Sequence, residues 1–188
     1  SIIKTNYIKI DDLKKLTLTM KPSNLKRFIL NNISKGNIQV KIDIFFDDSF
    51  NLENYKINGD LNKVNILVTD KLNFEETSFD FIVDNDLVTI NSLNSNFKKI
   101  PISNGNIKIN KKDQFDITGS VNTNLDSSKN NLKDIFSDFI NSKVFDNELK
   151  VSSNFTNKFD ISLSKSLEIK DYNINISGNI DNSNIKFS

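Results

Sequence analysis

Apolar and polar residues alternate along most of the chain. The clearest example is residues 115–125, where odd positions hold Phe, Ile, Gly, Val, Thr and Leu and even positions hold Asp, Thr, Ser and Asn. A period of two is typical of a β-strand with one dry face and one wet face. Residues 37–46 repeat this alternation. We therefore expect strands that are apolar on one side only.

Two stretches have helical spacing instead. After Ser23, apolar residues recur three, four and eight positions after the first, at Leu25, Phe28, Ile29 and Ile33. This stripe predicts a helix from Ser23 to Ser34, with Ser23 as its N-cap and Gly36 as the left-handed residue that ends it. Residues 132–144 show the same spacing and predict a second helix.

Short polar segments mark the expected turns. They lie at residues 11–12, 47–49, 84–86, 103–105 and 111–113. The first of these turns would separate two N-terminal strands, residues 2–10 and 16–20. An interruption of the alternation at Asn62-Lys63 predicts a β-bulge. Sequential strands joined by such short turns pair antiparallel, as a meander.

The balance of elements predicts the fold class. A one-sided sheet must cover its dry face with a second sheet, a helix or a ligand. Two helices are few for so many strands, so we predict a mainly β fold. Its expected form is a curled antiparallel meander, a β-taco or half-barrel groove, capped by two short amphipathic helices. No Pro- or Gly-rich linker interrupts the pattern, and residues 1–188 are expected to form a single groove domain.

Glycine positions indicate an internal repeat. Gly59, Gly119 and Gly178 lie 60 and 59 residues apart, each among apolar residues of a predicted strand. This near-period favours a segment of a longer repeat-like protein, with possible sub-repeats near 23–125 and 126–188. A glycine in a strand leaves space for a tight bend or for something that approaches the backbone. An ordinary gap in a core is the alternative.

Composition argues against most chemistry. The chain has no Cys and no His, and its 25 Lys and Arg nearly balance its 24 Asp and Glu. Disulfides, imidazole chemistry and a basic footprint for nucleic acid are thereby excluded. Acidic pairs occur at residues 11–12, 47–48, 75–76 and 84/86. We interpret all four as solvated turns rather than the carboxylate pair of a glycoside hydrolase, and we expect no enzymatic activity, cofactor, metal or nucleic-acid partner.

Basic and apolar segments bear on membranes. Lys98-Lys99 and Lys111-Lys112 suit the protection of strand ends against edge pairing. No run of 18 apolar residues is present, and the chain begins within a predicted strand. We therefore expect any membrane anchor to lie in another part of a longer protein. The first helix, flanked by Lys26 and Arg27, suits either a cap on the sheet or a membrane surface, and capping is the favoured interpretation.

The order of these motifs resembles the AsmA-like superfamily, and within it the periplasmic central region of YhdP-type proteins. The resemblance lies in a helix followed by Gly36-Asn-Ile-x-Val, then Ile57-x-Gly59-x-Leu61, and finally Phe115-x-Ile117-x-Gly119. It covers residues 23–125 well and the remainder loosely. The chain departs from the family pattern by having no Trp in the first helix, where Phe28 occupies the comparable place.

The resemblance implies a function. Members of the family form a long groove, apolar inside, that is tethered to the inner membrane of Gram-negative bacteria and crosses the periplasm. They are implicated in phospholipid transport to the outer membrane and in envelope integrity. The expected partners are a phospholipid or other acyl-chain lipid and neighbouring β-repeats of the same chain. The expected lipid-binding face comprises Ile38, Val40, Ile42, Ile44, Ile57, Gly59, Phe79, Phe81, Ile107, Ile109, Phe115, Ile117, Gly119 and Val121.

Two other functions fit parts of the pattern. A structural or adhesive β-sandwich module of a secreted or surface protein would use the same alternation with a closed core. A carboxylate-based hydrolase would need two acidic side chains from different strands to converge in a cleft. The shape of the sheet and the placement of the carboxylates distinguish these possibilities from a groove.

Overall fold

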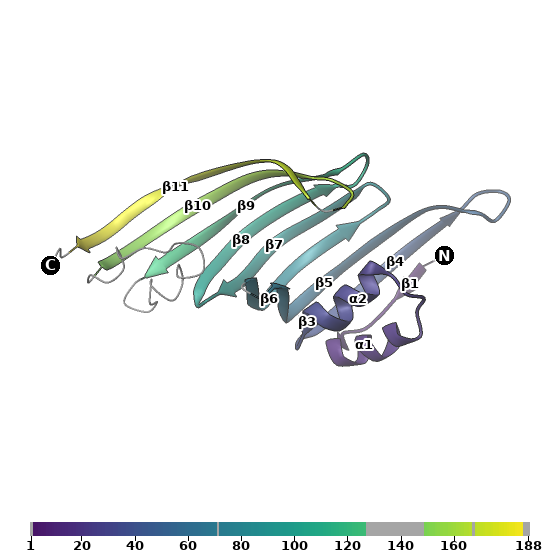
Figure 1. Cartoon of the computed structure of the whole chain (residues 1–188). Helices are drawn as coiled ribbons and strands as arrows, with labels where there is room; N and C mark the ends of the chain where they lie inside the picture. Colours follow the sequence, from purple (N-terminus) through teal and green to yellow (C-terminus); the bar gives the residue numbers. More distant parts are fainter. Residues whose placement is uncertain (1, 71, 127–148, 167, 186–188) are drawn as a thin grey trace.

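The computed structural model describes residues 2–70, 72–126, 149–166 and 168–185. They form one 11-stranded antiparallel sheet and two short helices (Figure 1). The sheet is curled but not closed, because β1 and β11 lie at opposite ends of its strand order. The predicted fold class, a mainly β curled meander with helices on it, is thereby confirmed.

The elements follow one another in a simple order. The strands are β1 (Ile2–Lys4), β2 (Ile8–Lys9), β3 (Ile33–Ser34), β4 (Asn37–Phe46), β5 (Leu52–Thr69), β6 (Leu72–Val83), β7 (Leu87–Phe97), β8 (Ile100–Asn110), β9 (Phe115–Asp126), β10 (Leu149–Leu163) and β11 (Ile169–Ile185). Helices α1 (Ile10–Leu18) and α2 (Asn24–Asn32) separate β2 from β3. From β4 onward each strand pairs with the strands next to it in sequence, while β1 and β2 pair with β4 and β3 pairs with β5.

A bulge interrupts each of the strands β5 to β8. The register shifts coincide with residues of left-handed backbone, namely Lys63 (φ 53°), Glu76 (φ 50°), Ser92 (φ 56°) and Asn104 (φ 52°). A bulge adds one residue to one strand and so restores the alternation in a new phase. Leu61 and Val64 illustrate the result, since both are buried in one cluster although they lie three residues apart. The bulge predicted at Asn62-Lys63 is confirmed.

The helices pack on the apolar face of β4, β5 and β6. The buried cluster consists of Ile10 of α1, Ile33 after α2, and Leu61 and Val64 of β5. Partly buried neighbours complete it: Leu13, Ile29, Ile38, Ile66, Phe79 and Phe81. The helices thus cap one end of the sheet, as expected for the predicted helix at residues 23–34, which corresponds to α2.

Two predictions about the first helices need correction. Residues 10–18 form α1, not the turn and strand expected around Asp11-Asp12. The alternation of Leu16, Leu18 and Met20 suggested a strand, but all three side chains are exposed, and the buried positions Ile10 and Thr17 have helical spacing. The carboxylates of Asp11 and Asp12 lie in the first turn of this helix, where their negative charge interacts favourably with the positive end of the helix dipole.

The start of α2 was predicted correctly and its end was not. Ser23 is the N-cap, and its hydroxyl accepts a hydrogen bond from the Lys26 backbone N–H at 3.1 Å. The helix ends at Asn32, where extended Ile33 begins β3, so Gly36 does not terminate it. Gly36 does have φ +66°, and a Cβ there would lie 2.6 Å from the Lys63 carbonyl oxygen. Its role is therefore close approach to the β5 bulge. The predicted second helix lies outside the described residues.

Two predicted turns are strand interior instead. Ser103-Asn104-Gly105 lies within β8, where Asn104 forms the bulge, and the true turn before this strand is Lys98-Lys99, with φ of 47° and 68°. Glu75-Glu76 lies within β6, again at a bulge. A bulge and a turn both favour residues that tolerate left-handed backbone, so sequence alone confuses them. The turns predicted at 47–49, 84–86 and 111–113 lie between strands, as expected.

Candidate functional site

The strand register builds two apolar rows across the sheet. The first row takes one residue from each strand from β4 to β11: Val40, Gly59, Phe81, Ile90, Ile107, Gly119, Phe159 and Ile174. The second row does the same: Ile42, Ile57, Val83, Val88, Ile109, Ile117, Ile161 and Tyr172. We call these two rows the apolar track. With strands about 4.8 Å apart, the track is about 34 Å long.

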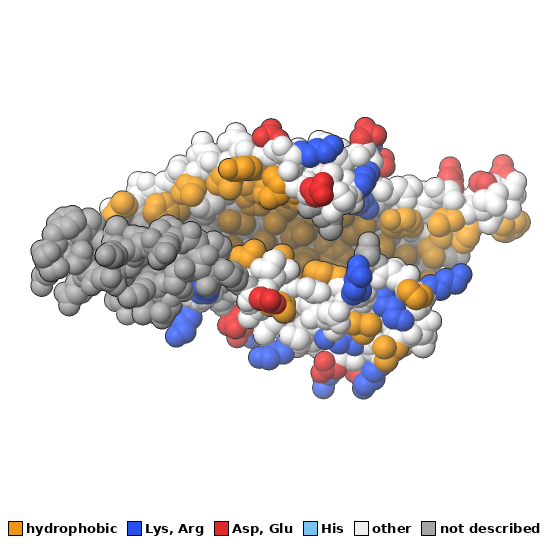
Figure 2. All heavy atoms as spheres, in the orientation of Figure 1, with side chains coloured by type: hydrophobic (Ala, Val, Ile, Leu, Met, Phe, Trp, Pro, Cys, Tyr) orange, Lys and Arg blue, Asp and Glu red, His pale blue; other side chains and the backbone are white. Residues whose placement is uncertain are grey.

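The track lines the hollow side of the curled sheet. Figure 2 shows hydrophobic side chains gathered in the recess between the upper strands and the helices. The members on β4 to β10 are half-buried. On the edge strand β11, Ile174 is 55% and Tyr172 is 66% exposed. A single sheet offers only one layer of side chains, so it leaves these residues in partial contact with solvent.

The register places the predicted lipid-binding residues on this one face. Nine of the fourteen belong to the track, and the other five lie on its strands. Four of these five flank the track on the same face, namely Ile38, Ile44, Phe79 and Val121, and Phe115 lies at the start of β9. Ile38, Phe79 and Phe81 pack against the cluster under the helices. Phe115 has the Lys165 ammonium 5.1 Å from its ring centre.

The strand glycines do not leave empty space. A Cβ at Gly119 would lie 2.7 Å from Cζ of Phe159, and a Cβ at Gly59 would lie 2.6 Å from Cζ of Phe81. In each pair the phenylalanine lies directly opposite the glycine on the next strand. Gly178 has the same relation to Phe155, on the preceding strand. The group that approaches the backbone of each glycine is therefore a neighbouring aromatic ring, and these glycines leave no gap in the track.

Several members of the track were missing from the predicted set. They are Val83, Val88, Ile90, Phe159, Ile161, Tyr172 and Ile174. Their alternation was visible in the sequence, but the cross-strand register that places them beside Gly119 was not. The Gly–Phe pairing was a usable signal, because a glycine in a strand interior needs a large neighbour to fill its place.

The opposite face of the sheet is polar. Its side chains form hydrogen-bonded ladders, such as Asn124 to Asn154 at 2.6 Å and Asn154 to Asp181 at 3.1 Å. Near β5 the Tyr7 hydroxyl donates to Asp60, and this bond, with the charges of Asp60 and Asp80, raises the pKa of Tyr7. This face therefore presents mainly hydrogen-bonding groups to water, in contrast to the track.

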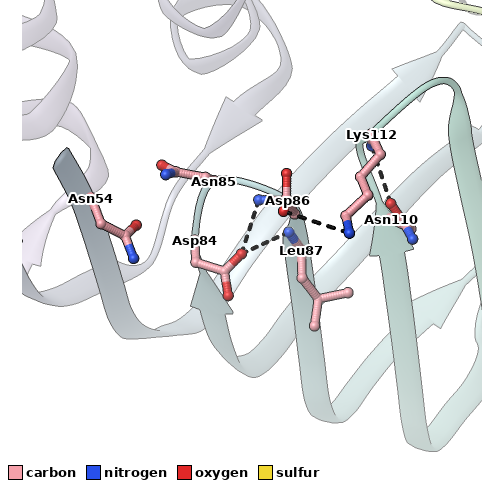
Figure 3. A pocket seen from close by; sticks show the side chains of 7 residues that line it. All are labelled: Asn54, Asp84, Asn85, Asp86, Leu87, Asn110 and Lys112. Atoms are coloured by element: carbon pink, nitrogen blue, oxygen red, sulfur yellow. Dashed lines mark hydrogen bonds and ion pairs between the residues drawn. The ribbon is translucent and has the colours of Figure 1, made fainter.

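The acidic residues at the ends of β6 and β7 form an ordinary turn. Figure 3 shows the Asp84 carboxylate accepting the backbone N–H groups of Asp86 (3.0 Å) and Leu87 (2.8 Å). The Lys112 ammonium, in the neighbouring turn after β8, lies 3.9 Å from the Asp86 carboxylate. At Asp47, hydrogen bonds from Asn51 hold the pKa of the carboxyl below its usual range. These carboxylates organise the backbone and do not face one another as an acid–base pair would.

Neither a metal cluster nor a membrane-spanning helix is present in the part of the chain that the structure describes. No group of three or more acidic, His or Cys side chains comes together among residues 2–70, 72–126, 149–166 and 168–185. No helix over those same ranges is long and apolar enough to cross a bilayer.

The fold and the track define an open, one-sided antiparallel β-meander with an apolar hollow. Comparison of the chain with protein-family models, with curated proteins and with solved structures gave no match.

Proposed function

We propose that the chain is a lipid-binding or lipid-conducting groove segment. The observation that carries this proposal is the apolar track, which runs without a polar member across β4 to β11 on the hollow side of the sheet. Exposed apolar rows of this extent are a cost in water unless something apolar covers them. An acyl chain suits a long, narrow and chemically uniform surface.

Dimensions and energetics support the proposal. The track is about 34 Å long by strand spacing, similar to the hydrocarbon thickness of a bilayer, about 30 Å, which holds two acyl chains end to end. Each buried methylene contributes about 0.8 kcal/mol, so an extended chain would bind without a specific headgroup site. Phe81 and Phe159 fill the places over Gly59 and Gly119. The acyl chain would therefore lie along the surface of the track and slide on it, rather than insert its end into a pocket.

The resemblance to the AsmA-like superfamily extends the proposal to a cellular role. In that setting the segment would be periplasmic, tethered to the inner membrane by another part of the protein, and would support phospholipid transport to the outer membrane. Neighbouring β-repeats would continue the sheet beyond β11, whose outer edge pairs with no described strand. A β-sandwich module is less well supported, because the described strands form one sheet and not two.

Lipid mass spectrometry of the purified protein tests the proposal. Ile117→Asp places a charge on the track, and Thr118→Asp places the same charge on the opposite face of the same strand. The protein and the Thr118→Asp variant are expected to carry acyl-chain lipid, whereas Ile117→Asp is expected to lose most of it. Circular dichroism confirms that both variants keep their strands. Absence of lipid from the unmodified protein, or equal lipid in the two variants, would contradict the proposal.

A further inference from the structure

Charge is distributed unevenly between the helices and the sheet. Residues 14–35 contain six Lys or Arg and no Asp or Glu. The rest of the chain therefore has 19 basic and 24 acidic residues, from totals of 25 and 24. A strongly basic segment on an otherwise acidic chain creates a local field that attracts anionic surfaces. We call α1, α2 and the residues between and after them, 10–35, the basic hairpin.

The same segment exposes large apolar side chains. Leu16 is 58%, Leu18 65%, Met20 47% and Phe28 40% exposed. Helix α1 faces the core through Ile10 and Thr17, which are buried, and so Leu16 and Leu18 remain outside. Figure 2 shows orange and blue spheres side by side over the helices. Exposed leucines, methionine and phenylalanine among lysines are the composition of a surface that rests in a membrane interface.

Hydrogen bonds hold the basic hairpin in shape. The Lys26 ammonium donates to the carbonyls of Leu18 (2.8 Å) and Met20 (2.7 Å), which ties the connection between the helices to α2. Acidic residues occur only at the start of α1, where Asp12 pairs with Lys15 at 2.9 Å. The exposed apolar residues are thus presented by an ordered segment, and the adjacent charge is almost entirely positive.

We propose that the basic hairpin docks on an anionic lipid bilayer. The apolar side chains would enter the boundary between headgroups and acyl chains, and the lysines would face the lipid phosphates. An acidic protein surface would suit the charge but not the outward leucines and methionine. Docking goes beyond the proposed function and is independent of it. If both hold, the β4–β6 end of the track would lie next to the membrane, because the helices pack there.

Vesicle co-sedimentation tests the docking. The probes are vesicles of phosphatidylcholine alone and of phosphatidylcholine mixed with phosphatidylglycerol. The protein is expected to bind the mixed vesicles, to bind the neutral ones at least tenfold more weakly, and to release the mixed ones as salt is raised. The double variant L18S/M20S and the charge reversal Lys21→Glu are each expected to weaken binding at least tenfold. Each changed side chain is exposed, so folding is retained.

Matched variants elsewhere provide the controls. Phe50→Ser removes an apolar side chain that is 87% exposed in the turn after β4, and Lys56→Glu reverses an exposed charge on β5. Both are expected to bind mixed vesicles like the unmodified protein. Failure to bind the mixed vesicles, or equal weakening by the hairpin and control variants, would overturn the proposal. Loss of lipid from Ile117→Asp with unchanged vesicle binding would separate the groove from the docking surface.

Fluorescence gives a second readout. The chain has no Trp, so Phe28→Trp places a single reporter on the basic hairpin and Phe50→Trp places one away from it. Docking predicts a blue shift for the first reporter on mixed vesicles and none for the second. If the Phe28→Trp variant binds vesicles without a shift of its fluorescence spectrum, the membrane contact lies elsewhere and the assignment of docking to the basic hairpin is overturned.

Discussion

The ring of Phe159 lies over Gly119, the residue directly opposite it on β9. A glycine in a strand loses side-chain packing, and an aromatic ring on the neighbouring strand recovers part of it. Gly59 and Phe81 repeat the relation in the same cross-sheet row, four strands away. The 60-residue spacing of the two glycines thus corresponds to a structural repeat of this pair.

Substitution of Gly119 by Ala is expected to destabilise the sheet. The added Cβ would meet Phe159 Cζ at 2.7 Å and the Asn106 carbonyl oxygen at 2.8 Å, so ring and backbone must shift at a cost of about 1–3 kcal/mol. Urea unfolding followed by circular dichroism measures the loss. Combining the change with Phe159→Leu should recover part of it, and strictly additive effects would show that the ring is not what the glycine accommodates.

The protein is expected to become more stable when Lys63 is replaced by Gly. Its φ of 53° is left-handed, a region that costs a non-glycine residue about 1–2 kcal/mol. Lys63→Gly should therefore raise the free energy of unfolding by up to about 1 kcal/mol, after the entropy of glycine is counted. Lys63→Val should lower it. Thermal unfolding of the two variants checks the order, and the reverse order would exclude a strained bulge.

A buried hydroxyl pair contributes to stability between β6 and β7. The Thr77 and Ser95 hydroxyl oxygens lie 2.8 Å apart. Both residues are buried, with exposed fractions of 2% for Thr77 and 6% for Ser95. Ser95→Ala would leave Thr77 without this partner, at a cost of about 1–3 kcal/mol. Ser153 is the matched comparison, because its buried hydroxyl has no hydrogen-bond partner among the described residues. Ser153→Ala should be neutral or stabilising, and an equal loss in both variants would contradict this account.

Tyr7 is expected to ionise at a higher pH than an ordinary tyrosine side chain. The hydrogen bond to Asp60 and the nearby acidic charges raise its pKa above 10.0. A raised pKa means that the bond stabilises the fold below pH 10 and that this contribution is lost as the pH rises through the pKa of folded Tyr7. Tyrosinate absorbance of the protein and of Tyr7→Phe isolates this titration. Asp60→Asn should lower the pKa of Tyr7, whereas Asp160→Asn on β10 should leave that pKa unchanged.

The sequence was sufficient for the sheet and its one-sidedness. Period-two alternation depends only on which face of a strand is buried, and that information is local. Prediction from the sequence failed where two structures have the same local signal. Asn104-Gly105 suits a bulge as well as a turn, and Leu16, Leu18 and Met20 alternate as strand residues do. The site was predictable by face but not by row, because the rows depend on a cross-strand register that bulges in β5 to β8 adjust.

The strand order has a consequence for how the molecule can vary. Because every strand from β4 to β11 pairs with its sequence neighbours, the sheet behaves as a one-dimensional stack whose length is set by the number of hairpins and not by closure. Adding or removing one hairpin would change the length of the hollow by about 10 Å without disturbing strands farther away. Length is therefore the property of this fold that insertions and deletions can tune most freely.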